Sequence, residues 1–150
     1  MLNLRRGVPH DASGLSGLAL RSKGHWGYDD AFLEACREEL TLSPEEIENN
    51  IVFVCEADGT IAGFYAIFGA PPEGEVRCLF VDPPFIGRGY GKRLWDHMLD
   101  QARLAGFSSL LIDSDPNAEA FYAAGGALRI GESPSGSIPG RMLPLLRVSL

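Results

Sequence analysis

The sequence is short of cysteine, of long apolar runs and of basic charge. Its three cysteines, Cys36, Cys55 and Cys78, are odd in number and far apart, which excludes a disulfide framework and a Cys-x-x-Cys metal site. Unpaired cysteines are typical of a reducing compartment, so we expect a cytoplasmic protein. No run approaches the roughly 18 apolar residues that span a bilayer, so no membrane partner is expected. The first residues also lack the apolar stretch of a secretory signal.

Net charge and chain length indicate which partners and how many domains to expect. The chain has 20 acidic and 13 basic residues, a net charge of −7, whereas a domain that neutralises many phosphates is usually basic. Nucleic acid is therefore not an expected partner. With 150 residues, 45% of them hydrophobic, the chain predicts one folded domain over residues 1–150. No cluster of His, Cys and Asp indicates a metal.

Local patterns predict helices and strands in mixed order. The strongest helical pattern follows residue 91, where Leu94, Trp95 and Met98 share an apolar stripe and His97 lies on the opposite, surface side. Asp58-Gly59 between two apolar runs predicts a hairpin. Further helices are predicted over 11–20, 29–40, from Ser43, and over 115–126, and strands over 2–5, 51–56, 61–68, 75–81, 110–113, 127–131 and 143–148. This order predicts an α/β fold with a mixed sheet.

Three glycines alternate with larger residues between a predicted strand and the strongest helix. Gly87, Gly89 and Gly91 lie with Arg88 and Lys92 in the stretch PFIGRGYGKRLW. The free amides of a first helical turn favour an anion, and glycine lets the backbone approach it, so a phosphate site is one interpretation. A tight turn that needs glycine for its geometry alone is the other. The spacing matches neither a P-loop nor the dinucleotide pattern G-x-G-x-x-G.

Two segments of the chain resemble one known family. Residues 86–91, IGRGYG, resemble motif A of the GNAT superfamily of acyl-CoA-dependent N-acetyltransferases, (Q/R)-x-x-G-x-(G/A), with Ile86 replacing the first residue. Residues 115–127, DPNAEAFYAAGGA, resemble a second family segment, with Ala127 replacing its closing aromatic residue. The resemblance implies a GNAT-like fold, with a central sheet of about six to seven strands and helices on both faces. It also implies an enzyme that transfers an acetyl group from acetyl-CoA to a primary amine of a small molecule or peptide.

The resemblance implies a set of residues that bind acetyl-CoA. The main-chain amides of the glycine turn hold the pyrophosphate, the strand at 79–81 binds the pantetheine arm as another strand would, and Asn117 bonds to that arm. The implied set is Leu79, Phe80, Val81, Gly87, Arg88, Gly89, Tyr90, Gly91, Lys92, Asn117 and Tyr122. Because GNAT-like domains often pair, a homodimer is also expected.

Two residues are candidates for proton transfer. The resemblance places Tyr122 beside the CoA sulfur, and a phenol pKa near 10 is close enough to a thiol pKa near 8.5 for assisted proton transfer. Glu75, at the start of a strand, is a candidate base for the amine. The alternatives are a tyrosine that only packs against the sheet, and a solvated glutamate in an enzyme that needs no single base.

The acceptor site is the least determined part of the sequence. His25, Trp26 and Tyr28 are candidates to contact the amine, since aromatic rings attract an ammonium group, and Arg141 is a candidate to bind an acceptor carboxylate. These residues could equally fill a gap in the core or pair on the surface. No cysteine lies in a motif, so direct transfer in a ternary complex is expected. A non-catalytic CoA-binding module and a nucleotide binder that uses only the glycine turn are the alternative functions.

Overall fold

The computed structural model describes residues 2–150, which form one seven-stranded sheet with helices against it. The α-helices are α1 (Ala12–Gly24), α2 (Asp30–Leu40), α3 (Pro44–Asn49), α4 (Tyr90–Leu104) and α5 (Glu119–Ala124). The strands are β1 (Leu2–Arg6), β2 (Ile51–Ala57), β3 (Thr60–Phe68), β4 (Glu73–Val81), β5 (Ser109–Asp113), β6 (Leu128–Pro134) and β7 (Met142–Ser149). Short 3-10 helices cover Pro9–Asp11, Pro83–Phe85 and Pro116–Ala118.

The sheet is mixed, as the order of elements predicts. Its strand order is β1-β2-β3-β4-β5-β7-β6, and β4 and β5 are parallel while every other described pair is antiparallel. Helix α4 makes the crossover that a parallel pair requires. The hairpin at Asp58-Gly59 joins β2 to β3, which confirms the predicted turn.

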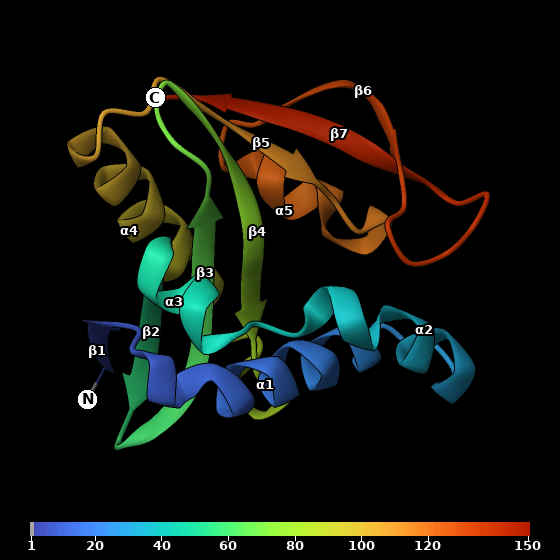
Figure 1. The fold of residues 1–150 in the computed structure, drawn as a ribbon, viewed down its shortest axis with the longest axis horizontal. Coiled ribbons are helices and arrows are strands. Elements are labelled where there is room, and N and C mark those ends of the chain that lie inside the picture. Colours follow the sequence, from blue (N-terminus) through green and yellow to red (C-terminus); the bar gives the residue numbers. More distant parts are fainter. Residues whose placement is uncertain (1) are drawn as a thin grey trace.

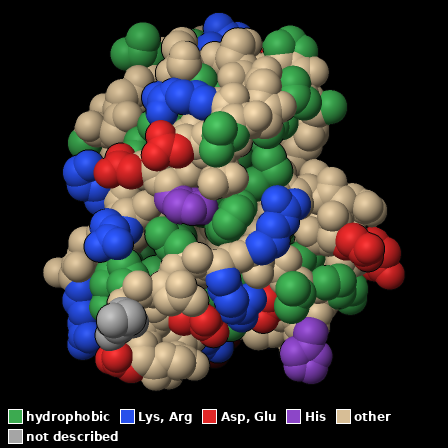
Figure 2. Space-filling model, turned by 90° about the vertical axis from the view of Figure 1, so that its left-hand side faces the viewer, with side chains coloured by type: hydrophobic (Ala, Val, Ile, Leu, Met, Phe, Trp, Pro, Cys, Tyr) green, Lys and Arg blue, Asp and Glu red, His purple; other side chains and the backbone are tan. Residues whose placement is uncertain are grey.

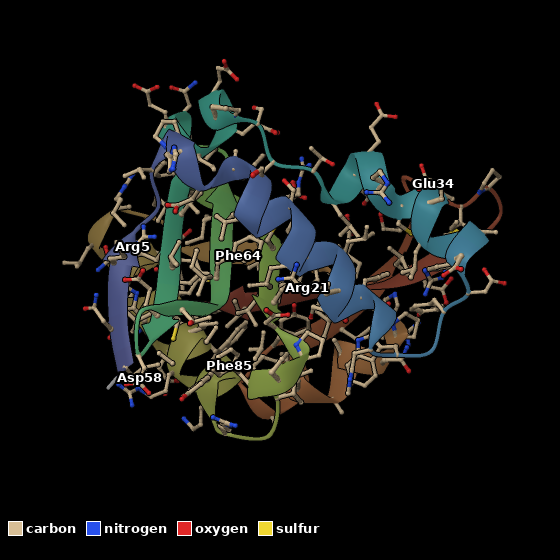
Figure 3. The ribbon with its side chains drawn as sticks, turned by 90° about the horizontal axis from the view of Figure 1, so that it is seen from below. Arg5, Arg21, Glu34, Asp58, Phe64 and Phe85 are labelled. Carbon is tan, nitrogen blue, oxygen red and sulfur yellow. The ribbon has the colours of Figure 1, made fainter. Side chains whose placement is uncertain are left out.

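Apolar side chains are buried on both faces of the sheet. One cluster lies between the sheet and helices α4 and α5, and includes Leu94, Met98 and Tyr122. The other lies under α1 and α3, and includes Leu15, Leu18 and Phe64. Figure 3 shows α1 crossing the strands with Phe64 beneath it. Helices on both faces and a seven-stranded sheet confirm the predicted fold class.

Helix α1 is longer than the sequence pattern predicts. It continues to Gly24, beyond residue 20 where the predicted helix ends. Near its end Arg21 donates from Nε and Nη2 to the carboxylate of Asp82, both at 3.0 Å, and Asp82 directly follows β4. This pair fixes the second half of α1 beside the end of β4, and Figure 3 shows Arg21 on that side of the helix.

The prediction that His97 is a surface residue holds only in part, because the residue is half-buried. Its Nδ1 lies 2.9 Å from the hydroxyl of the fully buried Tyr65, and its ring contacts Phe53 with the two centroids 4.7 Å apart. Burial lowers the pKa of His97. Position 97 lies beside the apolar stripe of α4, and two aromatic residues from β2 and β3 extend the core to reach it.

Charged side chains of both signs are interspersed on the face that carries α4 and β1 (Figure 2). Ion pairs between close neighbours account for the mixture. Lys92 lies 2.9 Å from Asp96 within the first turns of α4. Opposite charges four residues apart face one another on a helix, so this pattern follows from local spacing.

Candidate active site

A cavity of about 470 Å³ opens where β4 and β5 part. The two strands pair only through Glu73–Ser109, Gly74–Leu110 and Glu75–Leu111. Beyond Glu75 the β5 side of β4 has no strand partner among residues 2–150, and Figure 1 shows the two strands diverging. An unpaired strand edge presents main-chain donors and acceptors that can bind an extended ligand.

Nearly all the residues predicted to bind the cofactor line this single cavity. Arg88 is the exception, because its guanidinium lies over the ring of Phe85, with Cζ 5.5 Å from the ring centroid. The predicted residues that line the cavity are Leu79, Phe80, Val81, Gly87, Gly89, Tyr90, Gly91, Lys92, Asn117 and Tyr122. They come from three separate stretches of the chain that the fold brings together.

The glycine turn meets a geometric need as well as lining the cavity. Gly87 and Gly89 have φ of +87° and +82°, a backbone conformation that other residues adopt at a cost. Gly91 lies against Phe121, and a Cβ there would be 3.3 Å from the ring. Gly89 caps α4 without a side-chain hydrogen bond, so the amides of the first turn have no intrahelical partner. The geometric interpretation of the glycines is therefore confirmed, and the phosphate site stays a prediction.

Tyr122 lies on α5 with its side chain between the core and the cavity. The residue is only 8% exposed, and burial raises the pKa of its phenol. Within residues 2–150 its hydroxyl makes no hydrogen bond, yet it is not a buried unsatisfied atom, so it reaches the open space of the cavity. A protonated phenol in this position can donate to a bound ligand.

Helices α4 and α5 are packed together through Trp95 and Gly125. The indole Nε1 donates to the carbonyl oxygen of Gly125 at 3.1 Å. A Cβ at position 125 would lie 2.5 Å from the same indole nitrogen, so only glycine fits. The rings of Phe121 and Tyr122 also contact this indole, with centroids 6.2 and 5.6 Å away. The helix that begins at the glycine turn and the helix that carries Tyr122 therefore pack directly on each other.

The four predicted acceptor-site residues separate into two groups. Trp26 lines the cavity and is 48% exposed, and His25 packs edge-on against it with centroids 5.5 Å apart. Tyr28 and Arg141 do not line the cavity. They lie behind its wall, in a polar network around Asp115.

Asp115 is the centre of that network. Its Oδ2 accepts from Lys23 Nζ at 2.7 Å and from the Tyr28 hydroxyl at 2.9 Å, and Oδ1 accepts from the Asn117 main-chain amide at 2.8 Å. The Tyr28 hydroxyl in turn accepts from Arg141 Nη2 at 2.8 Å and from Asn117 Nδ2 at 3.1 Å. Burial alone would raise the pKa of Asp115, but its hydrogen bonds outweigh burial and the pKa is lowered. The network joins α1, the α5 segment and the β6–β7 loop.

Glu75 lies beside the cavity and does not line it. Its Oε1 accepts from Nε of Arg77 at 3.2 Å, and it is Arg77 that lines the cavity. The two positions occupy the part of β4 where its pairing with β3 is irregular. The candidate base Glu75 thus contacts a residue that lines the cavity but does not line the cavity itself.

Several cavity residues were missed by reasoning from the sequence. Lys23 lies beyond the predicted end of α1. Arg77 and Asp113 belong to strands that were predicted from their apolar residues, so their charged side chains were not considered as site residues. Asp115 was interpreted only as the start of a helix. Glu39 bonds to Ser137 across a long sequence separation that no local pattern reveals.

Within residues 2–150 no group of three or more His, Cys, Asp or Glu side chains is placed to hold a metal ion. No helix in the same range is long and apolar enough to cross a membrane.

Comparison with known proteins identifies the family of the chain. Residues 21–126 match the Acetyltransferase (GNAT) family. An amino-acid acetyltransferase of Neisseria meningitidis is 38% identical over an alignment of 90 residues that covers 57% of this chain and 21% of that protein. The chain thus spans about a fifth of the length of the curated relatives it matches.

Solved structures share the fold. The PaiA N-acetyltransferase of Thermoplasma acidophilum, in complex with coenzyme A, has a TM-score of 0.81 at 18% identity and covers 100% of this chain and 99% of its own. The N-acetylglutamate synthase of Neisseria gonorrhoeae, complexed with coenzyme A and N-acetyl-glutamate, has a TM-score of 0.70 at 24% identity and covers 100% of this chain and 35% of its own. Fold, motifs and family match agree: the chain belongs to the acetyltransferase (GNAT) family, whose members transfer an acetyl group from acetyl-CoA to an amine.

Proposed function

We propose that this protein transfers the acetyl group of acetyl-CoA directly to a primary amine of a small molecule or peptide, with both substrates held between β4 and β5. One observation carries the proposal: the unpaired edge of β4, the uncapped start of α4 and the Tyr122 side chain all line one cavity. Holding two reactants in a productive geometry is itself a large part of catalysis.

Different residues of the cavity have different roles in the proposed reaction. The free amides at the start of α4, with Lys92, suit the pyrophosphate of acetyl-CoA. The edge of β4 at residues 79–81 suits the pantetheine arm, and an amide there can donate to the thioester oxygen as it gains negative charge. Tyr122, kept protonated by its raised pKa, donates a hydrogen bond to the departing sulfur. Attack of the amine forms the amide C–N bond as the thioester C–S bond breaks. The proton that the amine loses is taken up by the departing thiolate, which leaves free CoA thiol.

Direct transfer is supported by the state of the cysteines. Cys36, Cys55 and Cys78 are all buried and unpaired, and none of them lines the cavity. Burial raises the pKa of Cys78 to about 12, and the thiolate is the nucleophilic form of cysteine. An acetyl-cysteine intermediate is therefore disfavoured.

The role of Glu75 as the base remains a prediction. Its carboxylate bonds to Arg77, so proton transfer from the amine would pass through water. A Glu75→Gln variant with an unchanged pH–rate profile for every amine would contradict the role.

The acceptor class is proposed from the relatives. Curated relatives are named amino-acid acetyltransferases, so amino acids are the first acceptors to test. The experiment has two stages. Calorimetric titration with acetyl-CoA, with ATP and NAD as controls, tests the cofactor; release of free thiol on addition of amines then tests transfer. Binding of acetyl-CoA without thiol release for any amine would favour a non-catalytic CoA-binding module.

We also propose one catalytic domain over residues 1–150, acting in the cytoplasm as a homodimer. The three unpaired cysteines support a reducing compartment. The outer strand β6 supports self-association, because its edge carries Leu128 and Ile130 at 73% and 46% exposure. Sedimentation equilibrium measures the mass, and a mass of one chain at micromolar concentration would contradict the dimer.

A further inference from the structure

Arg77 lies in the irregular part of β4 and lines the cavity. Ala66 pairs with Cys78 and Ile67 pairs with Val76, so Arg77 is the extra residue of a β-bulge. A bulge re-aims the side chain that it carries, and bulges are common beside active sites. Arg77 lies two residues, about 7 Å along a strand, before Leu79, where the unpaired edge suits the pantetheine arm.

The guanidinium of Arg77 is held on two sides. Its Nε donates to Glu75 Oε1 at 3.2 Å, and its Cζ lies 4.6 Å from the centroid of the Phe68 ring. Arginine has five N–H donors, of which Glu75 accepts one. Within residues 2–150 the two Nη atoms have no partner, so their shared edge is free to bind an anion. Two Nη atoms side by side match the two oxygens of a carboxylate.

The other cations near the cavity have partners. Lys23 lies 2.7 Å from Asp115, and Lys92 lies 2.9 Å from Asp96. Arg141 donates to Tyr28, stacks over Phe32 and lies 3.8 Å from Asp115. Arg77 alone among these four combines a cavity position with an open pair of donors.

The same cavity also carries negative charge suited to an ammonium group. Glu39 and Asp113 line it, and the Glu39 carboxylate accepts from the Ser137 hydroxyl. A cation and two carboxylates complement a molecule that carries both an amine and a carboxylate, such as an amino acid.

We infer that Arg77 binds the carboxylate of the acceptor, and that Glu75 is the positioning residue that holds Arg77 in place. The inference rests on the proposed acetyl transfer and names the group that the acceptor presents. Arg77 fixes one end of the acceptor so that its amine faces the thioester beside Leu79. Glu75 acts through the orientation of Arg77 and needs no contact with substrate.

The first test compares matched acceptors. Thiol release from acetyl-CoA is measured with the twenty common amino acids, with their primary amides, and with carboxylate-free diamines. Removing a charged partner costs about 10- to 100-fold, so the best amino acid should exceed its own amide by at least about 10-fold in kcat/KM. Equal or faster release with amides or diamines overturns the inference and leaves acetyl transfer intact. No release with any amine overturns both.

The second test uses variants with that best pair. Arg77→Gln should raise KM for the amino acid about 10- to 100-fold and leave KM for its amide unchanged. Arg77→Lys should give an intermediate KM, because lysine keeps the charge and loses the paired donors. Glu75→Gln should raise KM for the amino acid more than KM for its amide, because only the amino acid presents the carboxylate that Arg77 binds. Arg103→Gln, which removes an exposed guanidinium at the end of α4, is the matched control.

Calorimetric titration of each variant with acetyl-CoA shows whether it is folded and binds its cofactor. A folded Arg77→Gln enzyme with unchanged KM for the amino acid overturns the carboxylate role. A Glu75→Gln enzyme whose KM changes equally for the acid and the amide overturns the positioning role.

Discussion

The two halves of the cavity are built from different parts of the chain. The half suited to the cofactor consists mainly of backbone, from the edge of β4 and the turn at residues 87–91. The half suited to the acceptor consists of side chains, including Lys23, Arg77 and Asp115, from elements far apart in sequence. Backbone geometry needs only glycines and short motifs, which a sequence displays directly. Side-chain networks exist only after the fold has formed.

The largest expected effect separates chemistry from binding. Tyr122→Phe should lower kcat about 100-fold, because it removes the donor to the departing sulfur and keeps the ring. The Kd for acetyl-CoA should stay within about twofold of wild type, since the packing against Trp95 is retained. Single-turnover thiol release measures the chemical step. An unchanged single-turnover rate would leave Tyr122 as a packing residue only.

A slightly smaller effect tests the network behind the acceptor half. Asp115→Asn should lower the free energy of unfolding by about 2 kcal/mol, because Lys23 loses a charged partner in a half-buried site. Denaturant unfolding measures the change. Asp96→Asn, which breaks the exposed pair with Lys92, is the control and should cost at most about 0.5 kcal/mol. Equal costs would mean that the Asp115 network adds no more than a surface pair.

The glycine turn gives a third, modest effect. Gly89→Ala should cost about 1–2 kcal/mol of stability, since φ is +82° there, and should weaken acetyl-CoA binding. Gly14→Ala, in the first turn of α1 with open space around it, should instead stabilise by up to about 0.5–1 kcal/mol. Thermal unfolding and calorimetry on both variants give the comparison. If Gly89→Ala binds acetyl-CoA as wild type does, the turn serves geometry alone.

The smallest effect lies outside both halves of the cavity. Burial lowers the pKa of His97, so the unfolded chain binds its proton first as the pH falls below 6.5. The stability that neutral His97 contributes is present above that pH and is lost as the pH falls through the folded-state pKa. His97→Asn should flatten the dependence of unfolding free energy on pH between 7.5 and 5 by less than about 1 kcal/mol. A slope equal to wild type would show that His97 has the same pKa in the folded and unfolded states.

The sequence could predict the sheet, the helices on both faces and most of the cofactor half. Gly87, Gly89 and Asn117 were identified by position in motifs, and each lines the cavity. The acceptor half could not be predicted, because Tyr28 and Arg141 meet Asp115 only through the packing of three distant segments. His97 shows the limit of helical periodicity, since this residue beside the apolar stripe is half-buried against Phe53 and Tyr65 of the sheet.

The contact between Trp95 and Gly125 has a consequence for how the two substrates communicate. Because the indole bonds to the Gly125 carbonyl and leaves no room for a Cβ, α4 cannot shift without carrying α5 with it. A phosphate group that settles at the start of α4 would therefore set the height of the Tyr122 hydroxyl at the other end of the same ligand. This contact would make the rate of acetyl transfer depend on the length of the ligand. Acetylated pantetheine, acetyl-dephospho-CoA and acetyl-CoA should therefore differ more in kcat than in Kd.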